Sequence, residues 1–350
     1  MSNLASKASS SPLGFSPVGS EDDDIALESD GRPISPDRPL LRLLTRCALG
    51  GISAAFILGT LVASERDPVF SPHVLAPGSI EADGSQGAAG LHFLVSLFSA
   101  ALTMLAGAAA VLTDRRRWVR RLSLLTMVLV LFQMGSRLLA SSQLQAVWLS
   151  LVHPLSAQFL LVSLGMLSYA HSRELLSRLN SLVSATPSPL FPPSVFVFGL
   201  VALQLISGAF LRITDAGLAV PDFPTTGGGF LPLPTEAVVS QINQLRADLG
   251  LAPATLGQVL LHLTHRLGSV VLLFAGVLLG AKVLQSREFA ASKARTSAIL
   301  LLAGLLCETL IGAFLIWSLL DPIALSLHLC VSVMVLYSSA MLACRLRFQV

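Results

Sequence analysis

The sequence predicts an all-α, polytopic membrane protein with eight transmembrane helices in two pseudo-twofold related four-helix bundles. The chain of 350 residues is 53% hydrophobic and 12% charged, with a mean hydropathy of +0.74. A soluble domain of this length carries about a quarter charged residues. The chain also contains eight apolar segments that reach the roughly 20 residues needed to cross a hydrocarbon core as helix. The expected spans are 40–63, 88–113, 122–141, 145–170, 193–213, 254–284, 297–319 and 322–344.

Composition divides the chain into four parts. Residues 1–38 are rich in Ser, Pro, Gly and acidic residues, which indicates a disordered cytoplasmic tail. Residues 39–170 and 193–345 carry four spans each and are expected to form an N-terminal and a C-terminal four-helix bundle. Residues 171–192, which end in a Pro-rich stretch, are expected to be a cytoplasmic linker. Four spans return the chain to its starting side, so the two halves form a tandem parallel repeat.

Basic residues are concentrated in alternate connections. They crowd the N-terminal flank, the loops after the second, fourth and sixth spans, and the C-terminus. The positive-inside bias therefore places both termini in the cytoplasm, and a bacterial inner membrane is the expected location. The net charge of +3 reflects this topology and gives no reason to expect a nucleic-acid partner. The four cysteines lack metal-binding spacing and are most simply apolar filler.

Four histidines lie inside expected spans, and their spacing repeats between the halves. His92 and His153 are 61 residues apart, and His265 and His328 are 63 apart. An ionisable side chain in a bilayer is costly and usually marks a functional site. Imidazoles on two facing helices are typical axial ligands of haem iron, so each pair is predicted to hold one haem. The alternative is that each histidine only makes a hydrogen bond between helices.

Other residues near this layer are candidates for supporting roles. Arg266 and Arg212 are expected to meet haem propionates at the external side. His262 shares a helix face with His265 and is a candidate second-shell partner, proton relay or substitute ligand. Glu308 lies mid-span and is a candidate proton carrier or a helix–helix hydrogen-bonding group. Small residues beside the histidines, which would admit the porphyrin edge, are Ala88, Ala89, Gly90, Gly268 and Ser269.

Pro154 directly follows His153 and lies within the fourth expected span. A proline inside a helix removes a hydrogen bond and restricts the residue before it. We therefore expect a bend in this span and non-helical geometry at His153.

An ordered series of motifs runs through residues 195–345. Its members are QLISGAFLR (204–212), TDAGLA (214–219), PDFP (221–224), HRLG (265–268), Glu308-x-x-x-Gly312 and His328. Together they resemble the heme A synthase family, membrane proteins that oxidise a methyl group of heme O during cytochrome oxidase assembly. The resemblance implies a haem b cofactor on His265 and His328, and a heme O substrate facing His92 and His153.

The chain departs from the family pattern at several positions. Ala89 and Phe93 stand where the family has Glu and Arg, Glu308 stands where it favours Gln, and Val220 and Thr226 stand near its paired loop cysteines. The resemblance therefore supports haem binding more directly than it supports synthase activity.

Three classes of function follow from these patterns. The first is a heme A synthase-like oxidoreductase that converts a methyl group of heme O to a formyl, with Glu308 or His262 in proton transfer. The second is a non-enzymatic membrane haem b protein for electron transfer or oxidase assembly. The third and weakest is a transporter. Expected partners are heme O, the lipid bilayer, heme O synthase, oxidase assembly factors and a second copy of the chain.

Overall fold

The structure, a computed structural model, describes residues 37–66, 83–140, 147–180, 186–230, 235–290 and 292–349. These ranges contain α-helices and one short 3₁₀ helix but no β-strand. Nearly all of the expected N-terminal tail and most of the first connecting loop lie outside the described residues. The helices are α1 (Pro39–Arg66), α2 (Asp83–Thr113), α3 (Arg117–Ala140), α4 (Val147–Ala170), α5 (Arg173–Leu179), α6 (Phe191–Ile213), α7 (Glu236–Asp248), α8 (Leu256–Gln285), α9 (Lys293–Trp317) and α10 (Pro322–Phe348).

Eight of these helices are long and apolar enough to cross a membrane, and each overlaps one expected span. The spans are α1 to α4, α6 and α8 to α10, so the predicted all-α membrane class and the span count are confirmed, while the pseudo-twofold relation of the two bundles stays a prediction. The largest differences in a boundary are at α2, which begins at Asp83 rather than at residue 88, and at α3, which begins at Arg117 rather than at residue 122. Arginine is a good helix former, so a basic first turn extends α3 beyond its apolar stretch.

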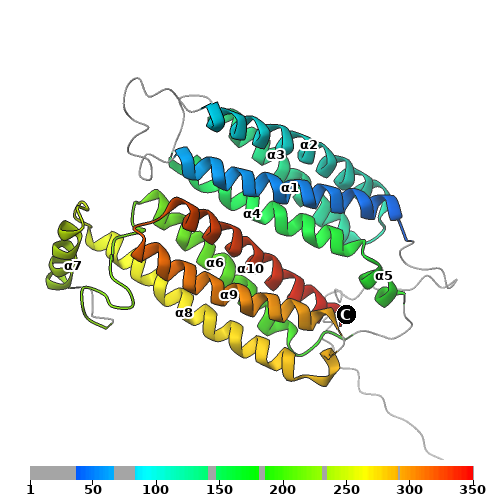
Figure 1. The fold of residues 1–350 in the computed structure, drawn as a ribbon. Helices are drawn as coiled ribbons and strands as arrows, with labels where there is room; N and C mark the ends of the chain where they lie inside the picture. Colours follow the sequence, from blue (N-terminus) through cyan, green and yellow to red (C-terminus); the bar gives the residue numbers. More distant parts are fainter. Residues whose placement is uncertain are drawn as a thin grey trace, which may run out of the picture.

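The spans pack in two groups that follow the chain order (Figure 1). The first group is formed by α1 to α4, in which α1 and α3 each contact α2 and α4. The second group is formed by α6, α8, α9 and α10, in which α8 and α10 each contact α6 and α9. The groups meet where α10 contacts α1 and α4, and where α4 contacts α6. Each group has its own apolar core, around Leu160 and Leu164 in the first and around Leu301 and Leu336 in the second.

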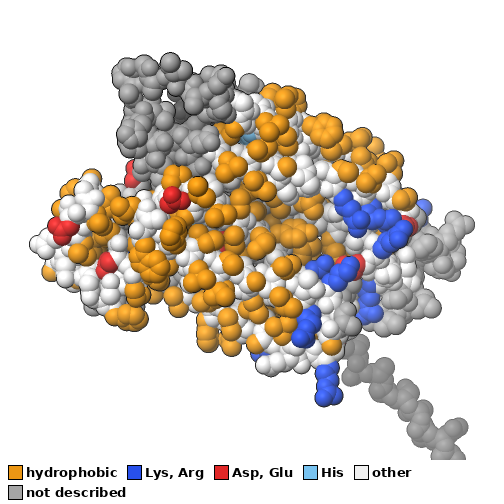
Figure 2. Space-filling model, in the orientation of Figure 1, with side chains coloured by type: hydrophobic (Ala, Val, Ile, Leu, Met, Phe, Trp, Pro, Cys, Tyr) orange, Lys and Arg blue, Asp and Glu red, His pale blue; other side chains and the backbone are white. Residues whose placement is uncertain are grey.

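Large apolar side chains also cover the outside of the bundle (Figure 2). Leu112 is 83% exposed and Phe274 is 66% exposed, and both lie in the middle or at the end of a span. Such a surface has no counterpart on a water-soluble monomer, whereas lipid tails solvate it well. The chain is therefore a multi-pass membrane protein.

The two ends of the bundle differ in charge. Lys and Arg side chains gather at the end where α1 begins and α10 ends, which we call the basic face (Figure 2). The opposite end carries residues 214–255 with α7, and we call it the loop face (Figure 1). This separation follows the alternation of basic residues along the chain.

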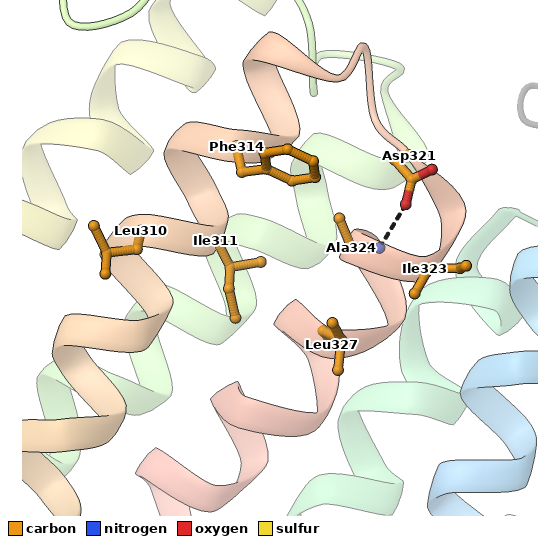
Figure 3. Close-up of a pocket in the computed structure, with 7 residues that line it drawn as sticks. All are labelled: Leu310, Ile311, Phe314, Asp321, Ile323, Ala324 and Leu327. Atoms are coloured by element: carbon orange, nitrogen blue, oxygen red, sulfur yellow. Dashed lines mark hydrogen bonds between the residues drawn. The ribbon is translucent and has the colours of Figure 1, made fainter.

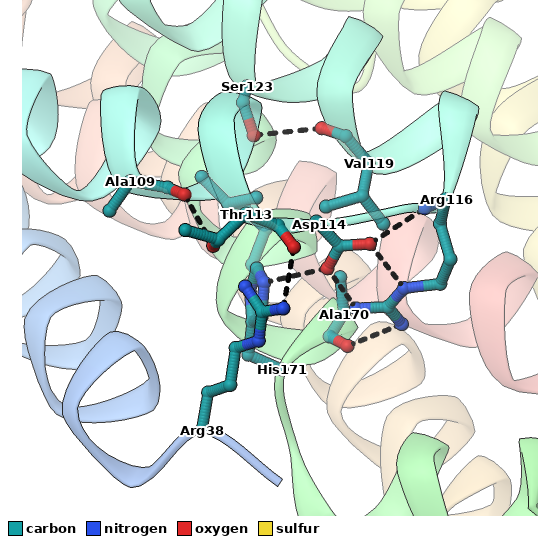
Figure 4. Close-up of polar contacts among 10 residues, drawn as sticks. Arg38, Ala109, Thr113, Asp114, Arg116, Val119, Ser123, Ala170 and His171 are labelled. Atoms are coloured by element: carbon teal, nitrogen blue, oxygen red, sulfur yellow. Dashed lines mark hydrogen bonds and ion pairs between the residues drawn. The ribbon is translucent and has the colours of Figure 1, made fainter. Parts of the chain in front are cut away.

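At the basic face, a buried ionic cluster joins the α2–α3 connection to the end of α4 (Figure 4). Asp114 Oδ2 lies 2.7 Å from Arg116 Nη2 and 3.2 Å from His171 Nε2, and Arg116 also donates to the carbonyl of Ala170 at 2.8 Å. Burial raises the pKa of Asp114, but hydrogen bonds from His171 and Arg116 outweigh it, so the net pKa lies well below the usual value.

The expected linker contains a helix of its own, α5, which docks onto the C-terminal group. Glu174 on α5 accepts hydrogen bonds from Lys293 of α9 at 2.8 Å and from Arg345 of α10 at 2.9 Å. Burial raises the pKa of Glu174, and these two cations lower it to a net value below the usual one. The linker is thus fixed against the ends of two spans.

The expected disruption at Pro154 is not found. His153 and Pro154 both lie within α4. The carbonyl of His153 accepts a hydrogen bond from Gln133 Nε2 at 2.9 Å and one from Ser156 Oγ at 3.0 Å. Polar side chains of the helix and its neighbour therefore satisfy the backbone near the proline, as is common in membrane helices.

Candidate functional site

The four candidate histidines lie in the first half of their helices. His265 follows the first residue of α8, Leu256, by nine residues, and His328 follows the first residue of α10, Pro322, by six. His92 and His153 lie nine and six residues after Asp83 and Val147, where the described parts of α2 and α4 begin.

Local sequence fixes the start of the two C-terminal histidine helices. Thr255 caps α8 and forms a capping box with Gln258. Asp321 caps α10 by accepting from the amide of Ala324 at 2.9 Å, with Pro322 at the first helical position. Because the caps fix where α8 and α10 begin, they also fix how far along each helix His265 and His328 lie.

Each of the four rings has its Nδ1 atom against a group on the neighbouring helix. The partner of His92 is the carbonyl oxygen of Ala55 on α1, at 2.9 Å. The partners of His153 and His265 are serine hydroxyls, Ser136 Oγ at 2.6 Å and Ser207 Oγ at 2.7 Å. The fourth contact joins His328 Nδ1 to Glu308 Oε2 at 2.7 Å.

This pattern is what iron ligation requires of the protein. A metal-bound histidine almost always has its second ring nitrogen held by a carbonyl, carboxylate or other polar group, which fixes the tautomer and the ring orientation. With Nδ1 engaged in this way, Nε2 is the ring atom left for iron; in His265 it also lies 3.3 Å from Gln204 Nε2. The same four contacts join neighbouring helices, as the alternative of bridging histidines also expects.

Glycines let three of the rings approach a neighbouring helix closely. A Cβ at Gly59 would lie 2.9 Å from His92 Cε1, and one at Gly208 would lie 3.2 Å from His265 Cε1. A Cβ at Gly312 would lie 3.7 Å from Cε1 of His328, which is an ordinary contact. The backbone at Gly59 and Gly208 therefore forms part of the wall against which the ring sits.

The two C-terminal histidines lie on helices that share the same two neighbours. His265 is on α8 and His328 is on α10, and each of these helices contacts both α6 and α9. Gln204 adds a further contact, donating to the backbone carbonyl of His265 at 2.9 Å with its amide nitrogen 3.2 Å from Nδ1. In the N-terminal half, Gln133 makes the equivalent contact to the carbonyl of His153.

The two arginines and His262 lie toward the loop face. Arg266 donates to three loop carbonyls, those of Val220 at 2.9 Å, Asp222 at 2.8 Å and Thr225 at 3.1 Å, and lies 5.5 Å from the ring centre of Phe223. Its contacts hold the loop in place, and its contact with a haem propionate stays a prediction. Arg212 lies half-buried in the last turn of α6.

His262 is buried against the same loop. Its Nδ1 lies 3.0 Å from the carbonyl of Ala216 and 3.4 Å from the amide of Val220. Asp222 completes the arrangement by accepting from the amides of Gly227 and Gly228, both at 2.9 Å. Burial raises the pKa of Asp222, and the Gly228 amide leads the hydrogen bonds that bring it below the usual value.

The helix α7 in this loop was not expected from the sequence. Ile242 is fully buried against the segment 216–220 and the start of α8, and Arg246 binds the carbonyls of Leu218 and Ala252. Burial lowers the pKa of Arg246. These backbone and side-chain contacts therefore fix the described part of the loop over the C-terminal site.

Two predicted details change in the structure. The space at Gly268 is taken by Gln204, since a Cβ there would lie 2.6 Å from Gln204 Oε1, so it is not room for a porphyrin edge. Sequence reasoning also missed Ser136 and Ser207 as partners of the histidines. In the sequence, each of these serines is distinguished only by standing next to a glycine within a span, Gly135 or Gly208. That pattern does not predict which histidine ring the serine contacts.

A shallow apolar groove of about 340 Å³ lies between α9 and α10, nearer the loop face than His328 (Figure 3). Leu310, Ile311 and Phe314 line it on α9, and Ile323, Ala324 and Leu327 on α10. The carboxylate of Asp321 at its rim is already used to cap α10 (Figure 3). The groove therefore presents apolar surface and offers no free polar group.

The residues fit haem better than a bare metal ion. In the described part of the chain, no three His, Cys, Asp or Glu side chains come together as a ligand set. A haem needs fewer side-chain ligands than a bare metal ion, because the porphyrin supplies most of the iron ligands and the protein adds only one or two axial side chains. Fold and site together define a helical, multi-pass membrane protein with histidines arranged as candidate haem ligands.

Comparison with known families agrees with this class. The chain belongs to the COX15-CtaA family of cytochrome oxidase assembly proteins, whose sequence model matches residues 88–340. The match includes all four histidines and the helices from α2 to α10 apart from a few terminal residues, while α1 lies before it. No curated protein matches the chain closely enough to count as an individual relative.

Proposed function

We propose that this protein is a heme A synthase-like oxidoreductase, which oxidises a methyl group of heme O to a formyl for cytochrome oxidase assembly. The observation that carries the proposal is the uniform engagement of Nδ1 in all four histidines. Membership in a cytochrome oxidase assembly family gives it a physiological context. The bilayer supplies heme O directly, since this substrate is apolar.

The overall reaction fixes what the site must handle. Converting a methyl group and one water to a formyl group releases four electrons and four protons, through an alcohol stage. The reaction therefore needs one place to hold the substrate and one route for electrons. We assign the substrate to His92 and His153 and a resident haem b to His265 and His328. When bound, haem b supplies one-electron transfer, while the protein orients its ring and excludes water.

The loop over the C-terminal half supports this division. The C-terminal pair lies beneath the loop fixed by Arg266, His262 and Asp222, as suits a cofactor that stays in place. Both halves expose apolar side chains beside a histidine, Phe93 at 45% next to His92 and Leu327 at 52% next to His328, so a haem from the bilayer meets an apolar surface at either pair.

The departures at Ala89 and Phe93 keep one alternative in view, a haem b protein that carries electrons without making heme A. Expression with and without heme O separates the two. The proposal expects heme A only when heme O is supplied. It also expects His92→Ala to retain haem b and lose heme A formation, whereas His265→Ala loses haem b. Bound haem b with heme O unchanged would instead establish the electron carrier.

A further inference from the structure

We infer that Glu308 is a positioning residue for His328, and that its contact with the ring lowers the reduction potential of the haem held by the C-terminal pair. The inference rests on the proposed haem site. It concerns a residue that touches neither the substrate nor the iron and that acts only through the imidazole.

The contact between the two side chains is short and buried. Glu308 Oε2 lies 2.7 Å from His328 Nδ1, and the two side chains are 16% and 25% exposed. Glu308 Oε1 has no hydrogen-bond partner in the described part of the chain. Nor does Glu308 form an ion pair with any lysine or arginine among the described residues. The interaction of this carboxyl group is therefore directed at one ring nitrogen.

Glu308 also distinguishes His328 from the other three histidines. Their Nδ1 atoms meet a backbone carbonyl at Ala55 and hydroxyls at Ser136 and Ser207. A carboxylate carries a negative charge that a carbonyl and a hydroxyl lack, and at short range inside a protein such a charge interacts strongly with the ring. One ligand of the four thus has a distinctly more basic partner.

The consequence for the iron follows from charge. When Nε2 binds iron, Nδ1 carries the ring proton, and Glu308 Oε2 lies 2.7 Å from Nδ1. The two atoms are close but do not have the alignment of a hydrogen bond, so the effect of Glu308 is that of a nearby negative charge. Ferric iron draws more electron density from the ring than ferrous iron does, so a carboxylate beside Nδ1 stabilises the ferric state more. Outer-shell partners of this kind raise the basicity of a ligating histidine and tune the reduction potential of haem. A lower potential suits a haem that must pass electrons onward.

A spectroelectrochemical titration of the purified, haem-loaded full-length protein tests the inference. Glu308→Gln preserves the shape but replaces the carboxylate with an uncharged amide. We expect the ferric-to-ferrous ratio at a fixed ambient potential to fall roughly tenfold, which is a rise in midpoint of about 59 mV for a one-electron couple. Glu308→Asp keeps the charge but withdraws it from the ring, and it should give a smaller rise in the same direction.

Glu174→Gln is the matched control. It removes a carboxylate that is also partly buried, but at the basic face and against Lys293 and Arg345. Its haem potential should equal that of the wild type. Equal midpoint potentials in the wild type and Glu308→Gln would overturn the inference but not the proposed haem site. A rise of the same size in Glu174→Gln would have the same consequence, because the effect would then not be specific to Glu308. Folded wild-type protein without any haem would overturn both.

Discussion

Replacing Gly208 with alanine tests whether the close approach of α6 to His265 matters for haem binding. The added Cβ would lie 3.2 Å from His265 Cε1, tighter than most real contacts, so the ring must move by a few tenths of an ångström. The ring is held at Nδ1 by Ser207 Oγ at 2.7 Å and cannot shift freely. Strain of this kind costs about 1 kcal/mol, which is roughly a fivefold loss of haem affinity.

Gly312→Ala is the matched control, because its Cβ would meet Cε1 of His328 at an ordinary 3.7 Å. Both substitutions replace a helical glycine with alanine, which by itself favours the helix by up to about 1 kcal/mol, so the two variants differ in the contact with the histidine ring. Haem titration monitored at the Soret band measures the affinities. Gly208→Ala should bind more weakly while Gly312→Ala binds like the wild type. Equal affinities in all three proteins would refute the assignment of His265 as a constrained ligand.

Three further predictions follow from the described contacts. Gly59→Ala forces a Cβ to within 2.9 Å of the ring of His92, so heme A formation should fall severalfold while haem b content, read from the pyridine haemochrome spectrum, stays constant. Asp114→Asn leaves a buried guanidinium without its counter-charge and should lower the free energy of unfolding by about 3 kcal/mol, measured by thermal denaturation in detergent. The folded pKa of Asp114 lies below its unfolded value of about 3.9. The stabilisation that its charge provides is therefore present above about pH 3.9 and is lost as the pH falls through the folded pKa. If the denaturation midpoint of Asp114→Asn followed the wild-type pH dependence, this role of Asp114 would be contradicted. Arg266→Lys cannot hold three loop carbonyls together, so hydrogen exchange in residues 214–230 should speed up, and unchanged exchange would show that the loop is held by other contacts.

The span count and helix registers could be predicted because they depend on local information. An apolar run of about 20 residues encodes a span wherever it lies in the chain. A regular helix then converts the spacing of His265 and His328 into depth. Pro154 misled the sequence argument because the hydrogen bonds that satisfy the backbone around it come from Gln133 and Ser156, and only the packed bundle brings them there.

The partners of the histidines could not be predicted, since they depend on how each helix is rotated about its axis. Ser207 reaches His265 and Glu308 reaches His328 only because α6 and α9 turn those faces toward their neighbours. The hydropathy of α9 is nearly uniform around its circumference, so sequence periodicity does not set its rotation. The loop contacts of Arg266 could not be predicted for a related reason, because the carbonyls that it binds converge only in the folded loop.

The central claim is that His265 and His328 coordinate one haem iron. Low-temperature EPR of the oxidised, purified protein tests it most directly. The wild type and His262→Ala should both give a low-spin ferric signal, since His262 binds loop backbone. Single alanine substitutions of His265 and His328 should each remove that signal or convert it to high spin. An unchanged low-spin signal in both of those variants would contradict the claim.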